Sequence, residues 1–406
     1  MSIKAYKYRI EVNKATQETL QWVLDRAREL YNAALAERKE AYRMAGKSIT
    51  YYAQKRDLVE IKEQIRPEYQ EIASHVLQDV ILRVKKAYDN FFRRVKHGEK
   101  PGHPRFQGRH RYDSFTYPDG AGWKLEVGKA PDEKRGKGKA LLHLSKIGTA
   151  KVILHRQIEG RIKTVTIKRE GTDWYAIFTC EVATKPLPIA YEDVGIDLGV
   201  THFAALSNGE FIDHPRYFRQ AEKKLVAAQQ AVSRKKRGSH RRAKAVKHLA
   251  KQHRKVRNQR KDFHHKASRQ LVNRYQVIAF EDVETKNLTK APAPRQDEAT
   301  GANLPNGASS KAGLNTSILD AGWGAFTEMI ATKAAWAGRQ VIFVNPKHTS
   351  QACSGCGTIV KKDLSDRWHS CACGTELDRD TNAAVNILAL GRKHLVVGTR
   401  PTSATT

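Results

Sequence analysis

This chain is short of acidic side chains and of long apolar segments. Its 406 residues include 42 Asp and Glu against 73 Lys and Arg, a formal charge of +31 at pH 7. That charge exceeds what solubility requires and favours a polyanionic partner, nucleic acid above all. No apolar run approaches membrane-spanning length, and the N-terminal MSIKAYKYRIEV lacks the apolar core of a secretory signal. We therefore expect a soluble cytoplasmic protein with no membrane partner, associated with the nucleoid when bound to DNA.

Cysteine is also scarce, with five residues in the chain, yet four of them lie near one another. Cys353 and Cys356 form a Cys-x-x-Cys pair, whereas Cys371 and Cys373 form a pair that is one residue shorter. The glycine after each pair permits a tight turn that aims backbone N–H groups at a thiolate, and four thiolates satisfy a tetrahedral Zn²⁺. A Cys-x-Cys pair strains the chelate, so His369 is an alternative to Cys373 as the fourth ligand. Free thiols or disulfides are the alternatives to zinc, which the clustering favours.

The positive charge is concentrated between Arg216 and Arg269. This segment holds 20 Lys and Arg but two acids, a net charge of +18 in 54 residues. Its apolar spacing predicts two long helices with basic faces, joined near Gly238. A hairpin that is merely solvated would carry acids for i,i+4 pairing, and these are nearly absent. We expect six residues near the joint to contact nucleic-acid phosphates: Arg234, Lys235, Lys236, Arg237, Arg241 and Arg242.

The N-terminal half predicts a small antiparallel β-barrel with a helical insertion. Residues 3–12 alternate between apolar and charged side chains, as in a half-buried strand. Apolar positions at helical spacing follow over residues 20–34 and 72–92, and we expect both stripes to be core. Cys180, alone in an alternating run, is also expected in the core. The runs that predict the other strands are residues 123–127, 140–144, 151–154, 163–168 and 174–182.

From residue 194 onward the pattern is that of a ribonuclease H-like domain. Three hairpin-linked strands precede the basic helices, after which strands and helices alternate. Acids fall at the ends of three of these elements: Asp197, Glu281 and Asp380. Two hard divalent cations need carboxylate oxygens that converge from different elements, so this arrangement suits Mg²⁺ or Mn²⁺ and phosphodiester chemistry. Any one of these acids could equally be a cap or a surface charge; their joint occurrence indicates a nuclease.

Two further segments lack signals of regular structure. Residues 286–315 are rich in Pro, Ala, Gly and Ser, which predicts a mobile loop that serves either as a lid or as a tolerated surface insertion. The residues after Lys393, ending in TRPTSATT, predict a disordered tail.

Five motifs carry a family resemblance: GIDLGV, FEDV, LDAGWGAFTEMIATKAAWAGRQVIFVNP, TSQACSGCG and DRDTNAAVNI. Together they resemble TnpB, the RNA-guided DNA endonuclease family of insertion-sequence transposons, which is related to type V CRISPR effectors. The resemblance spans nearly the whole chain. It implies that Asp197, Glu281 and Asp380 are the catalytic acids and that Asp378 has a supporting or capping role. The short second cysteine pair departs from the Cys-x-x-Cys of many relatives.

The resemblance implies an α/β multidomain protein that binds both RNA and DNA. Its partners would be a guide RNA from the transposon end, with one protein per RNA, and double-stranded target DNA cleaved with Mg²⁺ or Mn²⁺. The protein would also recognise a short motif in the DNA that flanks the target. We expect Tyr51, Ser74 and Gln78 to contact this motif. The implied domains are a wedge β-barrel (1–14 and 100–190), a helical recognition domain (15–99), a RuvC-like nuclease domain (191–348 and 375–393), a zinc ribbon (349–374) and a tail (394–406).

Three other functions remain as alternatives. A ribonuclease H-like transposase would share the acidic triad but would join strands. A nuclease-weak RNA-guided repressor would share the fold and lose an acid, whereas this chain keeps all three. A basic zinc-ribbon RNA-binding protein without chemistry leaves Asp197 and Glu281 unexplained. The residues favour the nuclease.

Overall fold

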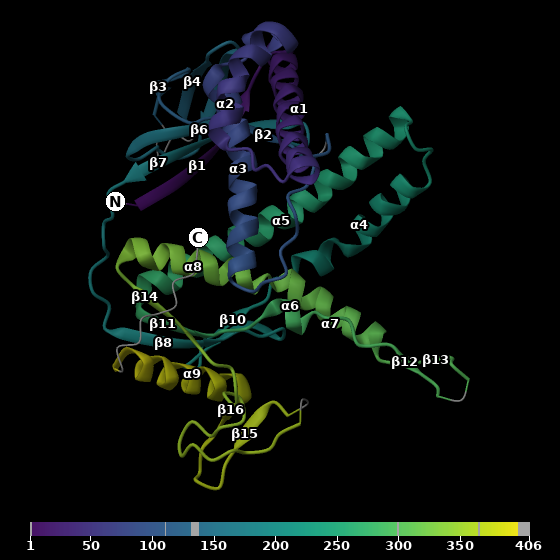
Figure 1. Cartoon of the computed structure of the whole chain (residues 1–406). Coiled ribbons are helices and arrows are strands. Elements are labelled where there is room, and N and C mark those ends of the chain that lie inside the picture. Colours follow the sequence, from purple (N-terminus) through teal and green to yellow (C-terminus); the bar gives the residue numbers. More distant parts are fainter. Residues whose placement is uncertain (1, 110, 131–137, 299, 364–365, 397–406) are drawn as a thin grey trace. The chain divides into compact units, whose positions relative to one another are not determined.

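The computed structural model describes the chain except for residues 1, 110, 131–137, 299, 364–365 and 397–406 (Figure 1). The chain divides into two compact units, Met1–Ala183 and Thr184–Thr406. None of the helices in the described ranges is both long and apolar enough to cross a membrane.

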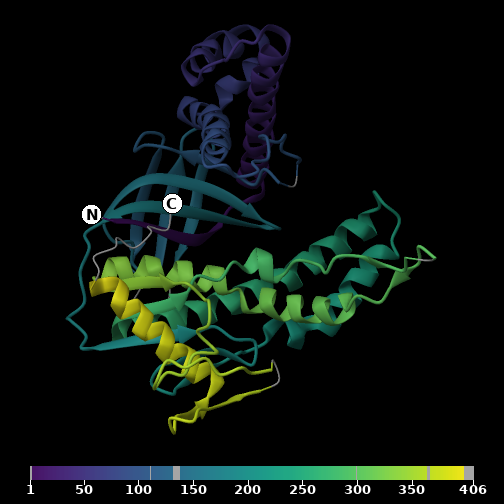
Figure 2. The same ribbon diagram turned by 60° about the horizontal axis from the view of Figure 1, so that its bottom comes forward.

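The first unit is built on a seven-stranded antiparallel sheet in the order β2-β6-β7-β1-β5-β4-β3 (Figure 2). Its N-terminal strand lies in the middle, because it pairs with both β5 and β7. Cys180 on β7 is fully buried, as predicted. Within the described residues the edge strands β2 and β3 do not pair with each other, so the sheet is an open half-barrel and not the closed barrel expected. The strands are β1 (Ser2–Glu11), β2 (Ser114–Tyr117), β3 (Trp123–Lys129), β4 (Gly138–Leu144), β5 (Gly148–Leu154), β6 (Arg161–Glu170) and β7 (Asp173–Val182).

Helices are inserted between β1 and β2. α1 begins where the side chain of Asn13 accepts a hydrogen bond from the N–H of Thr16, and it ends at Gly46 in the left-handed conformation. The apolar stripe of α1 is buried as predicted. On α3 burial stops at Val84, and Phe92 is 61% exposed, so the predicted core stripe is wrong at its C-terminal end. The elements are α1 (Lys14–Ala45), α2 (Tyr51–Glu60), a π-helical turn (Ile61–Ile65), a 3₁₀ turn (Pro67–Glu71) and α3 (Ser74–Lys96).

The second unit contains a five-stranded mixed sheet in the order β10-β9-β8-β11-β14. Consecutive strands β8, β9 and β10 pair antiparallel, while β11 and β14 run parallel to β8. Their order in the chain, three hairpin-linked strands before the basic helices and two strands after them, is the one predicted from the sequence. They are β8 (Glu192–Asp197), β9 (His202–Leu206), β10 (Phe211–Asp213), β11 (Tyr275–Glu281) and β14 (Gln340–Val344).

Helices cover both faces of this sheet (Figure 1). On one side lie α5 (His240–Arg274) and α8 (Trp323–Ala337), and on the other lies α9 (Arg379–Val396). Successive side chains of β11 point to opposite faces of the sheet, so the strand contributes to the core on both sides. Phe280 packs in one core cluster with Phe326 of α8, whereas its neighbour Ala279 packs in another with Ile387 of α9.

The basic segment forms two helices, α4 (Tyr217–Ser233) and α5, as predicted. They pack along each other in both views (Figures 1 and 2). The turn between them contains Gly238 with φ of +83°. Ser239 then begins α5, because its side chain accepts a hydrogen bond from the backbone N–H of Arg242.

Residues 286–315 are not the structureless loop that the composition predicted. They include most of α6 (Thr285–Leu288), a hairpin of β12 (Arg295–Gln296) and β13 (Asn303–Leu304), and the start of α7 (Ala308–Ala321). Small residues are compatible with helix, and alanine favours it. Lys311 and Asn315 donate to the carbonyls of Leu288 and Thr289, which ties α7 to α6. α9 also continues to Val396, into the predicted tail, whose remaining residues lie outside the described ranges.

Candidate metal centre and acidic site

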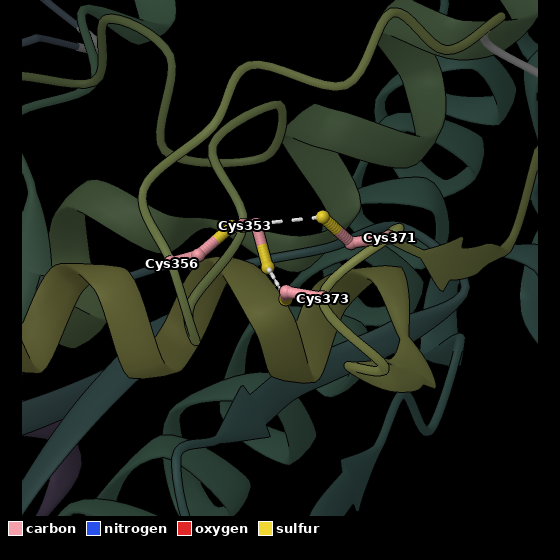
Figure 3. A group of neighbouring side chains, drawn as sticks. All are labelled: Cys353, Cys356, Cys371 and Cys373. Atoms are coloured by element: carbon pink, nitrogen blue, oxygen red, sulfur yellow. Dashed lines mark hydrogen bonds between the residues drawn. The ribbon is translucent and has the colours of Figure 1, made fainter.

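The four clustered cysteines lie between β14 and α9, where β15 (Trp368–Ser370) and β16 (Glu376–Asp378) form a short hairpin. Their Sγ atoms all lie within 4.8 Å of one another (Figure 3). The Sγ atoms of Cys353 and Cys373 are 3.6 Å apart, as are those of Cys356 and Cys371. Four sulfurs around zinc, each about 2.3 Å from it, are about 3.8 Å apart, whereas disulfide sulfurs are about 2.05 Å apart. The spacing therefore fits zinc, and both members of the short pair reach the cluster.

Each cysteine pair turns at the glycine that follows it, as the sequence predicted. Gly357 and Gly374 have φ of +80° and +87°, which favours glycine. The N–H of Gly357 donates to the carbonyl of Cys353, and that of Gly374 to the carbonyl of Cys371, both at 2.9 Å. These two turns shape the backbone on either side of the four converging thiols.

His369, the alternative ligand, is fully buried beside the cluster but is not one of the converging groups. The side chain of Lys362 is hydrogen-bonded to its Nδ1, and no hydrogen-bond partner is found for its Nε2 among the described residues. Burial alone would raise the pKa of the Cys353 thiol, but hydrogen bonds, the strongest from the backbone N–H of Cys356, outweigh it and lower that pKa to about 5. Because the Sγ atom of Cys373 converges with the other three and neither nitrogen of His369 does, the geometry favours Cys373 as the fourth ligand.

The three acids singled out from the sequence end three neighbouring elements. Asp197 is the last residue of β8, and Glu281 is the last residue of β11, the adjacent parallel strand. Asp380 is the second residue of α9, which packs on both strands. All three side chains are half-buried, so they are neither sealed in the core nor fully solvated.

The three carboxyl groups are electrostatically coupled. Burial, followed by the charges of Glu281 and Asp380, raises the pKa of Asp197 to about 8. Burial also raises the pKa of Glu281, and burial together with the nearby Asp378 raises that of Asp380. A divalent cation offsets the repulsion between partly buried carboxylates and stabilises their ionised form. These hard oxygen donors therefore fit Mg²⁺ or Mn²⁺. They converge less tightly than the thiols, which form the one close metal-binding group found in the described ranges.

Asp378 caps α9. Its Oδ1 accepts hydrogen bonds from the backbone N–H groups of Asp380 at 2.9 Å and Thr381 at 3.1 Å. These N–H groups have no partner within the helix itself. Of the two aspartates in the DRD motif, one therefore fixes the start of the helix and the other lies near Asp197.

Three residues that the sequence analysis did not single out join residues 349–374, the cysteine segment, to the acidic site. The hydroxyl of Thr349 donates to Glu281 Oε1. Asn386 Nδ2 donates to the carbonyls of Thr349 and Ala352, both at 2.8 Å, and Asn382 Nδ2 donates to the carbonyl of Ala352 at 2.7 Å. The two asparagines are four residues apart on one face of α9, and that spacing is the signal that could have revealed them.

The six residues expected to contact phosphates lie at the joint between α4 and α5. Residues 234–237 precede α5, and Arg241 and Arg242 lie in its first turn. All six are exposed or half-exposed, and no ion pair with an acid is found for them in the described part of the chain. Their charge is therefore available to an anionic partner.

The three residues expected to read a flanking motif lie on two adjacent helices of the first unit. Ser74 and Gln78 are one turn apart on α3, and Tyr51 begins α2. Burial, followed by the neighbouring Tyr52 and by Asp79 on α3, raises the pKa of Tyr51. Ser74 is exposed and accepts a hydrogen bond from Lys62 at 3.2 Å.

Three family models match parts of the chain. An OrfB model of IS605 elements, described as "Probable transposase", matches residues 177–291. A Cas12f1-like TNB domain model matches residues 323–387, which include the cysteine cluster and the first half of α9. An OrfB model described as a helix-turn-helix domain matches residues 1–47, where the structure has strand β1 followed by the single long helix α1.

Sequence relatives extend the match to nearly the full length. "Putative RNA-guided DNA endonuclease InsQ" of Escherichia coli K12 is 30% identical over 400 residues, 98% of this chain and 94% of the relative. A protein of Streptomyces pristinaespiralis with the same descriptive name is 30% identical over 399 residues, 96% of this chain and 89% of the relative. Among solved structures, CasPhi-2 (Cas12j) bound to crRNA superposes over 96% of this chain and 98% of that chain, with 10% identity and a TM-score of 0.46.

Proposed function

The chain belongs to the TnpB family of insertion-sequence transposons, and on this premise we propose that it is an RNA-guided DNA endonuclease. The observation that carries the proposal is the coupled set of carboxyl groups at the ends of β8, β11 and α9. A binding protein without chemistry has no need to hold three acids in a half-buried site at the expense of their mutual repulsion.

The acidic site is proposed as a RuvC-type nuclease centre with Asp197, Glu281 and Asp380 as metal ligands. The strand order, three antiparallel strands followed by two parallel to the first, supports a ribonuclease H-like domain. Bound there, Mg²⁺ or Mn²⁺ would stabilise the negative charge that develops on the scissile phosphate. The two strand ends and the cap of α9 by Asp378 orient the three carboxylates, and their half-buried position leaves one side open to a DNA backbone.

The cysteine cluster is proposed as a structural zinc site. Four thiolates occupy all positions of a tetrahedral ion and leave none for a substrate. Cys353, Cys356, Cys371 and Cys373 form a cluster of the right dimensions, which supports this assignment.

The proposed partners are a guide RNA transcribed from the transposon end, one RNA per protein, and double-stranded target DNA. The names of the relatives and the uncompensated cations at the α4–α5 joint support nucleic-acid binding. A heteroduplex gripped through its backbone requires many cations and few base contacts. Recognition of a short flanking motif is proposed for Tyr51, Ser74 and Gln78 on α2 and α3.

The proposal is tested by purifying the protein from cells that carry the flanking transposon end and sequencing the RNA that copurifies. A plasmid library with a target matched to that RNA and randomised flanks is then incubated with the complex and Mg²⁺. We expect cleavage that depends on the RNA, on one flanking motif and on Asp197. Absence of bound RNA, or cleavage that Asp197→Ala does not affect, would contradict the proposal.

A transposase is the second candidate, favoured by the description of the OrfB family model. It would use the same three acids, but the 3′ hydroxyl of the transposon end would attack a phosphodiester of a new strand and displace the 3′ oxygen of that strand. Incubation of the complex with labelled transposon-end DNA and an unlabelled plasmid separates the two functions, because joined products appear only for a transposase.

A further inference from the structure

We propose that Thr349 and Asn382 are positioning residues of the acidic site, through which the cysteine segment holds Glu281 and Asp380 in place. This inference rests on the proposed nuclease function and deepens it. It also gives the cysteine cluster a second role, besides folding the segment around it. The affinity of the acids for a divalent cation would then depend on whether the cluster holds zinc.

Thr349 acts on the Glu281 side. It is 3% exposed, and its hydroxyl donates to Glu281 Oε1 and lies 3.0 Å from the carbonyl of Pro346. A hydroxyl has one proton, and an ionised carboxylate is the stronger acceptor. In the described ranges Thr349 is the one hydrogen-bond partner found for the Glu281 side chain. This bond selects the orientation of the carboxylate and leaves Oε2 free for a cation.

Asn382 acts on the Asp380 side. It is fully buried, its Nδ2 donates to the carbonyl of Ala352 at 2.7 Å, and its Oδ1 accepts from the N–H of Ser354 at 2.9 Å. Both partners flank Cys353 in the chain. The helical turn that bears Asp380 is thereby bonded on both sides of the first cysteine.

Asn386 closes the connection between these two contacts. Its Nδ2 donates to the carbonyls of Ala352 and Thr349. Residues 349–354 therefore contact Glu281 through Thr349 and α9 through both asparagines. Glu281 and Asp380 are 99 positions apart in the chain, and they meet because α9 packs on β11. Side chains with repelling charges turn apart unless other bonds hold them. Thr349 and Asn382 supply such bonds.

The test compares Thr349→Val, which keeps the side-chain shape and removes the hydroxyl, with Thr349→Ser, which keeps the hydroxyl. Mn²⁺ binding to the protein–RNA complex is measured by electron paramagnetic resonance without target DNA, with the Asp197→Ala complex as the background for sites on the RNA. We expect Thr349→Val to weaken the Asp197-dependent Mn²⁺ binding by about tenfold or more, as loss of a partner that orients a ligand typically does. Thr349→Ser should restore it.

A second readout is the Mn²⁺ concentration that gives half-maximal cleavage, which should rise by a similar factor while the Kd for target DNA stays constant. Thr332→Val is the matched control, because the hydroxyl of Thr332 donates within its own helix. A merely structural role of Thr349 would lower the melting temperature without changing either Mn²⁺ readout, and that result would overturn the inference.

Cys373→Ser tests the same link if Thr349→Val does not fold, because Cys373 is exposed and belongs to the cluster. Elemental analysis reports its zinc content. A zinc-depleted variant that binds Mn²⁺ as tightly as the wild type overturns the inference. Cleavage by Asp197→Ala would instead contradict the proposed function, so the two failures are distinguishable.

Discussion

A Cβ atom on Gly195 would lie 2.1 Å from the carbonyl oxygen of Ala384. Strand β8 and helix α9 therefore touch backbone to backbone at this point, which only glycine permits. Gly391 repeats the arrangement from the helix side, where a Cβ would lie 2.8 Å from Cβ of Ala279 on β11. These two close approaches set the height of α9 above the sheet and hence the position of Asp380 relative to Asp197.

Gly195→Ala should displace α9 and separate the acids. Overpacking of this kind typically costs about 1–3 kcal/mol, and backbone cannot yield as a flexible side chain would. We expect a lower urea midpoint and loss of cleavage. Gly324→Ala on α8 is the matched control, since its Cβ would meet nothing within 4 Å and alanine favours helix. A Gly195→Ala protein with wild-type stability and cleavage would show that α9 can shift without consequence.

The sequence was informative where a local pattern repeats and uninformative where distant residues meet. The alternation of β7 and the apolar spacing of α1 lie within single elements, and both were predicted. β2 has four residues, too few for a clear alternation. Thr349 and Glu281 are 68 positions apart, and Asn382 and Ser354 are 28 apart. Helix or strand periodicity in the sequence cannot predict hydrogen bonds between residues so far apart.

Composition also misled in one place. The Ala-, Gly- and Ser-rich residues before Asn315 resemble a flexible loop, yet the chain from Ala308 onward is helical because its end packs in the core through Ile318 and Ala321. Tertiary packing stabilises the helix there, and a prediction from local composition does not take such packing into account.

Removal of the acids should separate catalysis from binding. Asp197→Ala, Glu281→Ala and Asp380→Ala should each abolish DNA cleavage and leave RNA-dependent target binding nearly intact, because these carboxylates act on the scissile phosphate and not on the heteroduplex. Parallel cleavage and filter-binding assays check this. Asp378→Ala should be milder, with loss of about 1 kcal/mol from the helix cap, and Asp378→Asn should retain the cap. Normal cleavage by Asp380→Ala with none by Asp378→Ala would reverse the roles assigned within the DRD motif.

Metal removal should distinguish the two metal sites. Moderate EDTA treatment should abolish cleavage, which added Mg²⁺ or Mn²⁺ should restore, while the purified protein keeps about one zinc because a site with four protein ligands is closed. Elemental analysis before and after treatment provides the measurement. Cys373→Ser should lower the zinc content, and His369→Ala should retain most of it. A folded, active protein with far less than one zinc per chain would remove the zinc assignment.

Lys333 should give the second unit a distinct pH dependence. It is 7% exposed, and burial, followed by the charge of Arg269, lowers its pKa from 10.5 to about 8. Between these two values the unfolded chain keeps a proton that the folded protein has released, so this group makes folding more favourable as pH rises. The difference in urea midpoint between wild type and Lys333→Met should therefore shift in favour of the wild type from pH 7.5 to 9.5. A constant difference would mean that the ammonium stays charged through its bonds to His265 and Ser268.

The basic joint between α4 and α5 should contribute affinity without sequence preference. Its six cations are expected to contact phosphates, so replacing several of them with Gln should weaken binding to all matched targets alike. Each lost contact should reduce the magnitude of the negative slope of log affinity against log salt by roughly 0.7 to 0.9. The flanking-motif preference should stay the same, because backbone contacts carry no base information.

The measurement is a salt titration of binding for the wild type and the Gln variant on targets with randomised flanks. A variant with two Gln substitutions at the joint is compared with Lys223→Gln plus Lys224→Gln on the exposed side of α4, a control of equal charge change away from the joint. An unchanged salt slope would mean that the joint is an ordinary solvated surface. A changed motif preference would instead place these residues in base recognition, since only contacts that distinguish bases can alter it.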